Sequence, residues 1–580
     1  MRAISGSGFR GFLALVLASA LAACGTTTTA SRASGDDLRS GGSLYGDFLV
    51  ASYAGNTRDS RVAAARYVAA LKQDPGNQIL LERAFVYSVA AGDMDAAARL
   101  APEVAKANPE SDLAPLIEGV IALKKRNYAA AKAHFTASHP AGSPDLMAAL
   151  ALAWTAVGLG DIDTARALLA PTGDPSADVF IAYHRARLEE ALKNPAGTDE
   201  AFQAADRATA GRSLTVALAY ASWLQATARA DMAAAVLARF LESSPGNPVG
   251  IAALGLLKAG EPVSRSIETP QQGASEGFYG IASAISDGEV QDAAIVYLRL
   301  AQYLDPDNDG ALAFLAGAME RAGRKDEAIE LYLAVPGSSP FHVTAQVAAA
   351  DLLDAKGETD RAVRILARLE DADPAGVLAA SALGDVYRTH ERWAEAVDAY
   401  SRAIARTGPD YVADDWALFY ARGIALERAG RWPEAEADFR TALKLSPDQP
   451  QVLNYLAYTW IERGENIDQA LAMLKRAVEQ RPDDGFIIDS LGWAYYRLGR
   501  WAEAVETLET AISFSPYDPT VNEHVGDAYW KVGREREARF LWSHALKLKP
   551  EAERVPILQA KLAGGLAAGE ALERQAAAGR

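Results

Sequence analysis

Residues suited to metal or nucleophilic chemistry are scarce in this chain of 580 residues. It contains one cysteine, Cys24, and seven scattered histidines. A single cysteine excludes an internal disulfide and a cysteine-based metal site. His134 and His139 are five residues apart and do not share a helical face. There is also no P-loop, no G-x-S-x-G and no H-E-x-x-H. We therefore expect a protein that is not an enzyme, with no catalytic residues, no metal and no cofactor.

One glycine pattern, Gly6-Ser7-Gly8-Phe9-Arg10-Gly11, fits G-x-G-x-x-G by letter. A dinucleotide-binding motif must follow a strand, and none precedes this one. The pattern also lies in residues 1–24, which are typical of a processing segment. Arg2 and Arg10 supply positive charge, and the stretch up to Ala23 is almost wholly apolar but too short to span a bilayer.

The processing segment ends in Leu21-Ala22-Ala23-Cys24-Gly25, which resembles a bacterial lipobox. The resemblance implies cleavage before Cys24 and lipidation of its thiol. The alternative is an ordinary signal peptide that is cleaved after Ala23. Gly25 stands where an aspartate would favour retention in the inner membrane, so we expect an outer-membrane lipid anchor facing the periplasm. Residues 25–42 are of low complexity and predict a flexible tether, about 23 Å long on average.

A period of 34 residues organises the rest of the chain. Leu491-Gly492-x-x-Tyr495 is followed by Ala504, Leu508, Ala511 and Pro516, and the same order returns at Val525-Gly526-x-x-Tyr529, Ala538, Trp542, Ala545 and Pro550. This order matches the tetratricopeptide (TPR) signature, in which each repeat is a pair of antiparallel helices.

The residue types explain how such a pair would pack. Gly492 and Ala504 are small enough to let the two helix backbones approach closely. Tyr495 and Leu508 fill the space beside them. Pro516 lacks an amide donor and ends the second helix.

Proline spacing extends the pattern over nearly the whole chain. Pro306, Pro340 and Pro374 recur at the period, as do Pro482, Pro516 and Pro550. The predicted fold is therefore all-α, a right-handed TPR superhelix of about 14 to 15 helix pairs. We expect an N-terminal segment over 43–259, an irregular break at 260–273 and a C-terminal segment over 274–550. A polar insertion interrupts the latter at Thr407 to Asp415, and residues 551–580 predict capping helices.

The net charge of -17 excludes several partner classes. Nucleic acid binding requires clustered Lys and Arg, and so does electrostatic docking on an anionic membrane. We therefore expect protein partners and no nucleic acid. The many carboxylates lie at helix-surface spacing, which is typical of a solvated face.

In a TPR array the first helix of each pair lines the concave side, so its groove-facing positions predict a partner-binding surface. Aromatic side chains next to Arg and Glu are typical of binding hot spots. The alternative is that several of these rings pack between adjacent repeats. The predicted groove residues are Asp385, Arg388, Tyr420, Arg428, Asn454, Tyr458, Asp489, Trp493, Tyr496, Arg497, Asp527 and Trp530.

Three stretches resemble a narrower family. They are Asn454 to Trp460 with the longer turn from Gly464 to Ala470, Asp489 to Arg500, and Gly526 to Trp530 with Glu537 to Arg539. Together they resemble proteobacterial outer-membrane TPR lipoproteins of about this length. The resemblance implies an adaptor that binds a periplasmic carboxyl-terminal processing protease and helps it degrade cell-wall hydrolases.

We therefore expect a non-catalytic, membrane-tethered scaffold for protein partners. A second hypothesis is an assembly factor for an envelope machine, such as a pilus, a secretin or a polysaccharide exporter. A remote third is a cell-wall hydrolase, which would require activity in the purified protein.

Overall fold

The computed structural model describes residues 42–138, 146–285, 291–373, 376–409 and 411–578. Within these residues the regular structure consists of α-helices and one 3-10 helix, with no strand. Each helix packs most closely on its neighbours in the chain, so the array is built from successive helix hairpins. The predicted all-α TPR solenoid is confirmed. The expected signal peptide and nearly all of the tether lie outside the described residues.

The chain divides into two compact units, the first ending at Leu369 and the second beginning at Glu370. The first unit is built from these helices: α2 (Leu44–Asn56), α3 (Ser60–Gln73), α4 (Gln78–Ala91), α5 (Met94–Ala107), α6 (Leu113–Lys124), α7 (Tyr128–Ala137), α8 (Leu146–Leu159), α9 (Ile162–Leu168), α10 (Pro175–Ala191), α11 (Pro195–Ala208), α12 (Leu214–Ala226), α13 (Ala230–Ser243), α14 (Pro248–Ala259), α15 (Pro270–Ile285), α16 (Gln291–Leu304), α17 (Asp309–Arg321), α18 (Lys325–Leu333), α19 (His342–Ala355) and most of α20 (Thr359–Ala372).

The second unit begins in the last turns of α20 and has the same hairpin construction. Its helices are α21 (Val377–Thr389), α22 (Trp393–Thr407), the 3-10 helix η2 (Ala413–Asp415), α23 (Trp416–Arg428), α24 (Trp432–Leu445), α25 (Pro450–Arg463), α26 (Ile467–Gln480), α27 (Gly485–Arg497), α28 (Trp501–Phe514), α29 (Pro519–Lys531), α30 (Glu535–Lys547), α31 (Arg554–Gly564) and α32 (Leu566–Ala578).

The two helices of a hairpin touch at the glycine that the repeat pattern singles out. A Cβ atom added to Gly492 would lie 2.6 Å from Cγ of Leu508, and one added to Gly526 would lie 2.6 Å from Nε1 of Trp542. The same Cβ at Gly492 would lie 3.2 Å from the backbone nitrogen of Leu508, so the two helix backbones approach closely there. Ala504 in the same hairpin is fully buried.

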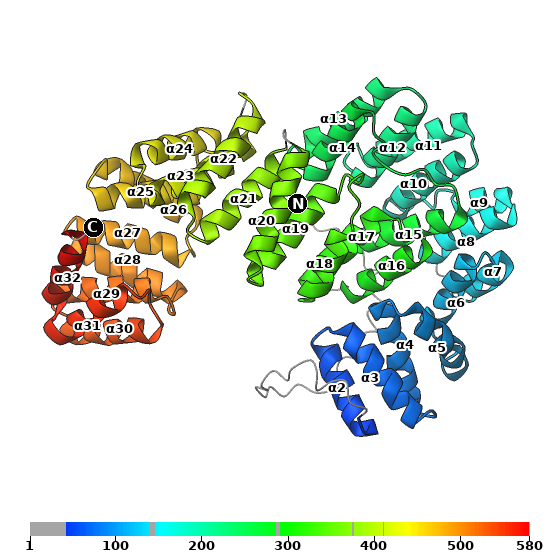
Figure 1. Cartoon of the computed structure of the whole chain (residues 1–580), viewed down its shortest axis with the longest axis horizontal. Helices are drawn as coiled ribbons and strands as arrows, with labels where there is room; N and C mark the ends of the chain where they lie inside the picture. Colours follow the sequence, from blue (N-terminus) through cyan, green and yellow to red (C-terminus); the bar gives the residue numbers. More distant parts are fainter. Residues whose placement is uncertain (1–41, 139–145, 286–290, 374–375, 410, 579–580) are drawn as a thin grey trace. The chain divides into compact units, whose positions relative to one another are not determined.

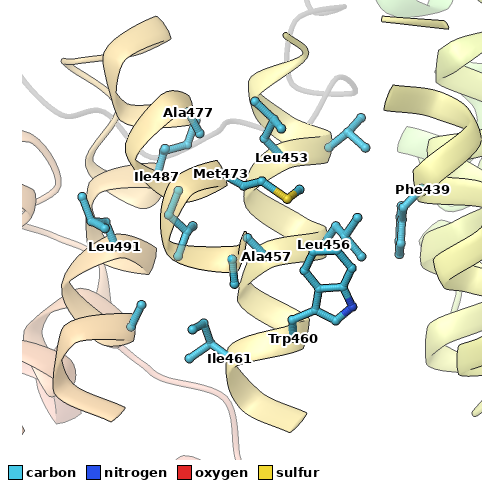
Figure 2. Close-up of a cluster of buried hydrophobic side chains, with 14 of the residues drawn as sticks. Phe439, Leu453, Leu456, Ala457, Trp460, Ile461, Met473, Ala477, Ile487 and Leu491 are labelled. Carbon is cyan, nitrogen blue, oxygen red and sulfur yellow. The ribbon is translucent and has the colours of Figure 1, made fainter. Parts of the chain in front are cut away.

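A continuous apolar core runs through the repeats of the second unit. Figure 2 shows Trp460 and Leu456 of α25 facing Phe439 of α24, with Met473 of α26 and Ile487 of α27 beside them. Trp460 and Phe439 are completely buried. Each repeat therefore buries its apolar face against the next, which is why a solenoid needs several repeats for stability.

The predicted break at 260–273 contains the stretch between α14 and α15. Residues 260–269 are non-helical, and α15 begins at Pro270, where a helix tolerates a missing amide donor. The helix start is reinforced by reciprocal hydrogen bonds. The backbone N–H of Thr269 donates to the side chain of Gln272, and that of Gln272 donates to Oγ1 of Thr269.

The non-helical stretch lies away from the boundary between the two compact units, which follows Leu369. It lies inside the first unit, because α15 folds back onto α6, α8 and α10, and α16 onto α4 and α6 (Figure 1). Ion pairs connect further distant helices of this unit. The carboxylate of Glu327 in α18 pairs with Arg61 of α3 at 3.0 Å and also with Arg299 and Arg324. The first helices of the early pairs are thus covered by later parts of the same chain.

Substitution of Gly492 by leucine tests the close contact. The added side chain would overlap Leu508 and the backbone of α28, so we expect a loss of about 1–3 kcal/mol or more in the free energy of unfolding. Thermal unfolding would measure it. Gly255→Leu is the matched control, because Gly255 is an exposed helical glycine with no atom near its Cβ position. An unchanged melting temperature for Gly492→Leu would contradict the assigned contact.

Candidate functional site

The predicted groove residues all lie on the first helices of hairpins in the second unit, but they meet different surroundings. At the N-terminal end, Asp385 accepts hydrogen bonds from the Tyr400 hydroxyl at 2.8 Å and from Arg388 at 3.3 Å, and its side chain is half exposed. Tyr420 packs against Phe439 and Tyr455 with ring centroids 6.1 Å apart in each case. Burial raises the pKa of the Tyr420 hydroxyl. Tyr420 is therefore mainly a packing residue.

The predicted groove residues of α23 and α25 include a more exposed side chain. The side chain of Arg428 is 61% exposed, while the neighbouring Glu427 accepts a hydrogen bond from the Tyr455 hydroxyl at 3.1 Å. Asn454 is half buried, and its Oδ1 atom has no hydrogen-bond partner within the described part of the chain. Arg428, which pairs with Glu427 at 3.7 Å, is thus an exposed cation on this face.

Four side chains from α25 and α27 form what we call the inner-face cluster: Tyr458, Glu462, Trp493 and Arg497. The indole N–H of Trp493 donates to Glu462 at 2.7 Å, and Arg497 donates to the same carboxylate at 2.9 Å. Burial raises the pKa of Tyr458, and Glu462 and Asp489 raise it further. The hydroxyl therefore stays protonated and can donate a hydrogen bond. The cluster combines apolar rings with exposed charges, as binding hot spots do.

Trp493 is fixed by stacking on both of its faces. Its ring lies 4.6 Å from Tyr496 and 4.0 Å from His524, with interplanar angles of 8° and 14°. Tyr496 is only 7% exposed, so it supports the tryptophan from below the surface. Rigid aromatic area loses little conformational entropy on binding, which favours Trp493 as an anchor.

Asp489, Asp527 and Trp530 are occupied by contacts within the chain. Asp489 is buried and accepts a hydrogen bond from His524 of the next repeat at 2.8 Å. Asp527 accepts a hydrogen bond from the ammonium group of Lys561 at 2.7 Å. Trp530 packs on Trp542 at 5.3 Å and fills the space beside Gly565 of the capping helices. Trp530 thus packs within its own hairpin and against the cap, and both aspartates have partners on the first helix of the following hairpin.

The charged cluster around Lys561 was not found from sequence. Lys561 of α31 is 1% exposed and contacts Glu523 at 2.6 Å as well as Asp527, while Arg554 donates to Glu523 at 3.1 Å. Burial alone lowers the pKa of Lys561, but the two carboxylates outweigh it and raise that pKa. Burial raises the pKa of Glu523, whereas Lys561 and Arg554 outweigh it and lower that pKa. A lone lysine in the apolar stretch from Ile557 to Leu562 was the available signal.

His524 was also missed as a partner of the groove. Burial lowers its pKa, but Asp489 and the nearby Asp527 and Glu523 outweigh burial and raise it. The imidazole lies between Trp493 and Asp489, and in its protonated form it adds a cation–aromatic contact to the stack. This group therefore positions the inner-face cluster from behind.

A second exposed surface lies at the start of the first unit. Tyr45, Leu49 and Tyr53 of α2 are exposed and spaced four residues apart, so they form one stripe along the helix. An open apolar stripe on the terminal helix of an array is typical of an interaction surface. It escaped the sequence analysis because α2 was treated only as part of a repeat.

Two kinds of feature are absent from the described residues. None of their His, Cys, Asp and Glu side chains gather in threes as metal ligands would. None of their helices is both long and apolar enough to cross a bilayer. Cys24, the predicted lipidation site, and the Gly6–Gly11 pattern lie outside the described residues.

Comparison with protein families supports the repeat assignment. Residues 282–343, 347–412 and 420–485 match a family model described as tetratricopeptide repeat, and residues 492–533 match one described as TPR repeat. These stretches are therefore TPR repeats. Domains of this class are scaffolds that bind protein partners on the surface of the solenoid, and they are typically not catalytic.

Individual relatives cover only part of the chain. It is 30% identical over 182 residues to the TPR repeat-containing protein PA4667 of Pseudomonas aeruginosa, covering 30% of this chain and 29% of that protein. It is 27% identical over 182 residues to the human protein O-mannosyl-transferase TMTC1, covering 31% of this chain and 20% of that protein. The chain thus spans less than a third of the length of both relatives.

Solved structures are similar at the level of repeats. The crystal structure of YrrB, described as a TPR protein with an unusual peptide-binding site, is 24% identical, with a TM-score of 0.25 over 30% of this chain and 86% of that chain. The Cut9–Hcn1 hetero-tetramer structure is 16% identical, with a TM-score of 0.37 over 86% of this chain and 98% of that chain.

Lys561→Met tests the buried charge cluster. The substitution leaves Asp527 buried without its cation, so we expect a loss of about 3–5 kcal/mol in the free energy of unfolding at pH 7. Burial already raises the pKa of Asp527. Without the ammonium the native state would favour the protonated carboxyl, so the deficit should shrink as the pH falls from 7 towards 5.

The contributions of Glu523 and Lys561 in the wild-type protein should change little over that range. The lowered pKa of Glu523 means that its contribution is lost only as the pH falls below the ordinary pKa of a glutamate, and the raised pKa of Lys561 means that its contribution is lost only at alkaline pH. Lys531→Met, which removes a half-exposed pair with Glu570, is the control and should cost under about 1 kcal/mol. Equal effects of the two substitutions at every pH would refute the assignment.

Proposed function

We propose that the chain is a non-catalytic scaffold that binds protein partners through the inner face of its second unit. The observation that supports this most directly is the inner-face cluster. It presents a stacked tryptophan and a tyrosine next to the exposed charges of Glu462 and Arg497. In the first unit, by contrast, α15 and α16 cover the early inner helices. The second unit is therefore the better candidate for binding in trans.

The pairing of the charged groups favours binding over catalysis. A general acid or base needs an ionisable group that can reach a substrate. Here the buried ionisable groups of the second unit pair with each other, as Lys561 does with Asp527 and His524 with Asp489. Their role is to fix one repeat on the next.

We further propose that Cys24 is lipidated and holds the array at the periplasmic face of the outer membrane. The support is the lipobox-like Leu21-Ala22-Ala23-Cys24-Gly25 and the position of the chain's single cysteine in it. A tether of about 23 Å would keep the solenoid close to the membrane yet able to reorient. Binding two proteins at such a scaffold raises their effective concentration without new chemistry.

The adaptor function is the more specific part of the proposal. In it the scaffold brings a periplasmic carboxyl-terminal processing protease to its cell-wall hydrolase substrates. The support is the family resemblance of the stretches around Tyr458, Trp493 and Trp530. The assembly of a pilus, secretin or polysaccharide exporter is the second candidate, and the identity of co-purified proteins distinguishes the two.

A double charge reversal, Arg428→Glu with Arg497→Glu, tests the inner face. We expect at least about tenfold weaker capture of the partner, equivalent to about 1.4 kcal/mol, because both cations face the proposed groove. Quantitative mass spectrometry of proteins co-purified from detergent-solubilised envelopes measures it. Arg536→Glu with Lys547→Glu, on the exposed side of α30, is the matched control. Undiminished capture by the first variant would count against the inner face.

Cys24→Ser tests the lipid anchor separately. Without a thiol there is no site for lipidation, so the protein should move from the membrane pellet to the soluble fraction. Fractionation followed by immunoblotting measures this, with Ser31→Ala in the tether as the control. Continued pelleting of Cys24→Ser would disprove lipid anchoring but would leave the protein-binding proposal intact.

A further inference from the structure

The non-helical residues 261–269, which we call the strap, run between α14 and α15 in the first unit. Side chains of two inner helices hold the backbone of the strap by its carbonyl groups. Gln225 of α12 donates to the carbonyl of Glu261 at 3.0 Å, and Ser222 of α12 donates to that of Ser264 at 2.7 Å. Arg187 of α10 donates to the carbonyl of Arg265 at 2.6 Å. Such contacts bind an extended backbone whatever its side chains are.

Two side chains of the strap provide its apolar contacts. Val263 and Ile267 are 1% and 5% exposed, although they belong to a segment without secondary structure. Between them the exposed Arg265 donates to the carbonyl of Asp307 at 2.7 Å and pairs with Asp305 at 3.3 Å. The strap thus combines main-chain hydrogen bonds with two buried apolar side chains, which is how extended peptides bind in grooves.

Two hollows flank the strap. One, of about 530 Å³, is lined by Ser222 and Gln225 of α12 together with strap residues. The other, of about 400 Å³, is lined by the same stretch of the strap and by Pro306 and Pro336. The strap therefore has open space on both of its sides.

The cation that grips the strap is positioned by other groups. Arg187 is buried and donates to Glu190 at 2.7 Å, and Tyr183 next to it donates to Glu276 of α15 at 3.0 Å. The contact between Tyr183 and Glu276 does not involve the strap, whereas Glu190 also forms a hydrogen bond with the side chain of Ser266 in the strap. Because Glu190 belongs to the same helix as Arg187, its pairing with the guanidinium does not require the strap, and the binding group is to that extent preorganised.

We propose that the inner face of α10 and α12 is a binding site for extended peptides, and that the strap occupies this site in cis. The peptides it fits have two aliphatic side chains four residues apart with a basic residue between them. This site is additional to the inner-face cluster of the second unit, and it does not depend on the lipid anchor or on the adaptor function.

Occupation in cis controls access to the site. A segment tethered at both ends has an effective concentration of the order of millimolar at its own site. A free peptide of equal intrinsic affinity therefore binds only in proportion to the fraction of molecules in which the strap is released. Weakening the strap should open the site without altering the side chains that line it.

The test uses the full chain and a fluorescent peptide with the strap sequence Glu-Pro-Val-Ser-Arg-Ser-Ile-Glu-Thr. By fluorescence anisotropy, the wild-type protein should not bind it at about 10 μM, because the strap competes in cis. Val263→Ala with Ile267→Ala weakens the strap and should improve peptide binding at least about tenfold. Adding Ser222→Ala and Gln225→Ala to that variant should reverse the gain. Glu261→Ala with Glu268→Ala changes only exposed strap side chains and should behave as wild type.

Two results would overturn the proposal. One is the absence of peptide binding to a folded Val263→Ala/Ile267→Ala protein, and the other is equal binding by all variants. If that variant does not fold, hydrogen exchange of the wild-type protein shows whether the strap can be displaced. Strap amides that exchange by local opening, faster than those of α12 and α15, support a displaceable segment. Strap amides protected as strongly as those helices would show that it opens only on global unfolding, which contradicts the proposal.

Discussion

The contact between a glycine on the first helix of a hairpin and a large side chain on the second is the constraint on which the structure depends. Gly119 faces Phe135, Gly384 faces Tyr400 and Gly423 faces Phe439, each so closely that a Cβ atom would lie 2.5–2.7 Å from the ring. All three rings are completely buried. The missing side chain lets the helices approach, and the ring fills the remaining space at interior density. Since this geometry recurs in hairpin after hairpin, the direction of each first helix is fixed, and with it the inner face.

The same inner face has different surroundings in the two units. In the first, α15 and α16 pack on α4, α6, α8 and α10, and the strap lies against α10 and α12. In the second, Arg428 and the inner-face cluster remain accessible, and only the last repeats are covered by α31 and α32. The repeats thus create a surface, whereas the segments that depart from the period decide which parts of it are open.

The sequence predicted what is periodic and missed what is not. The 34-residue period was sufficient for the all-α fold and for the close contact at Gly492, because each depends on residues within one hairpin. The fold-back of α15 could not be predicted, because it depends on contacts such as that of Gln271 with the carbonyl of Leu123, between residues 148 positions apart. In the groove, position within the repeat predicted Trp493 and Arg497 as partner-binding residues, and the structure brings both to Glu462. Position within the repeat could not show that Asp489 and Asp527 are buried, since their partners His524 and Lys561 lie on the first helix of the following hairpin.

The buried charges at the C-terminal end explain why the cap docks on one repeat only. The fifth and ninth residues of α29 are Glu523 and Asp527. The corresponding residues are Asp489 and Trp493 in α27 and Asn454 and Tyr458 in α25. Only the last repeat therefore presents two carboxylates to Lys561. Against either earlier helix the same lysine would be buried with at most one counter-charge, at a cost of several kcal/mol. A buried ion pair adds little stability compared with apolar packing, but it discriminates strongly between correct and incorrect neighbours. The charges that the repeat pattern predicted as a binding surface thus serve, at this end of the array, to terminate it.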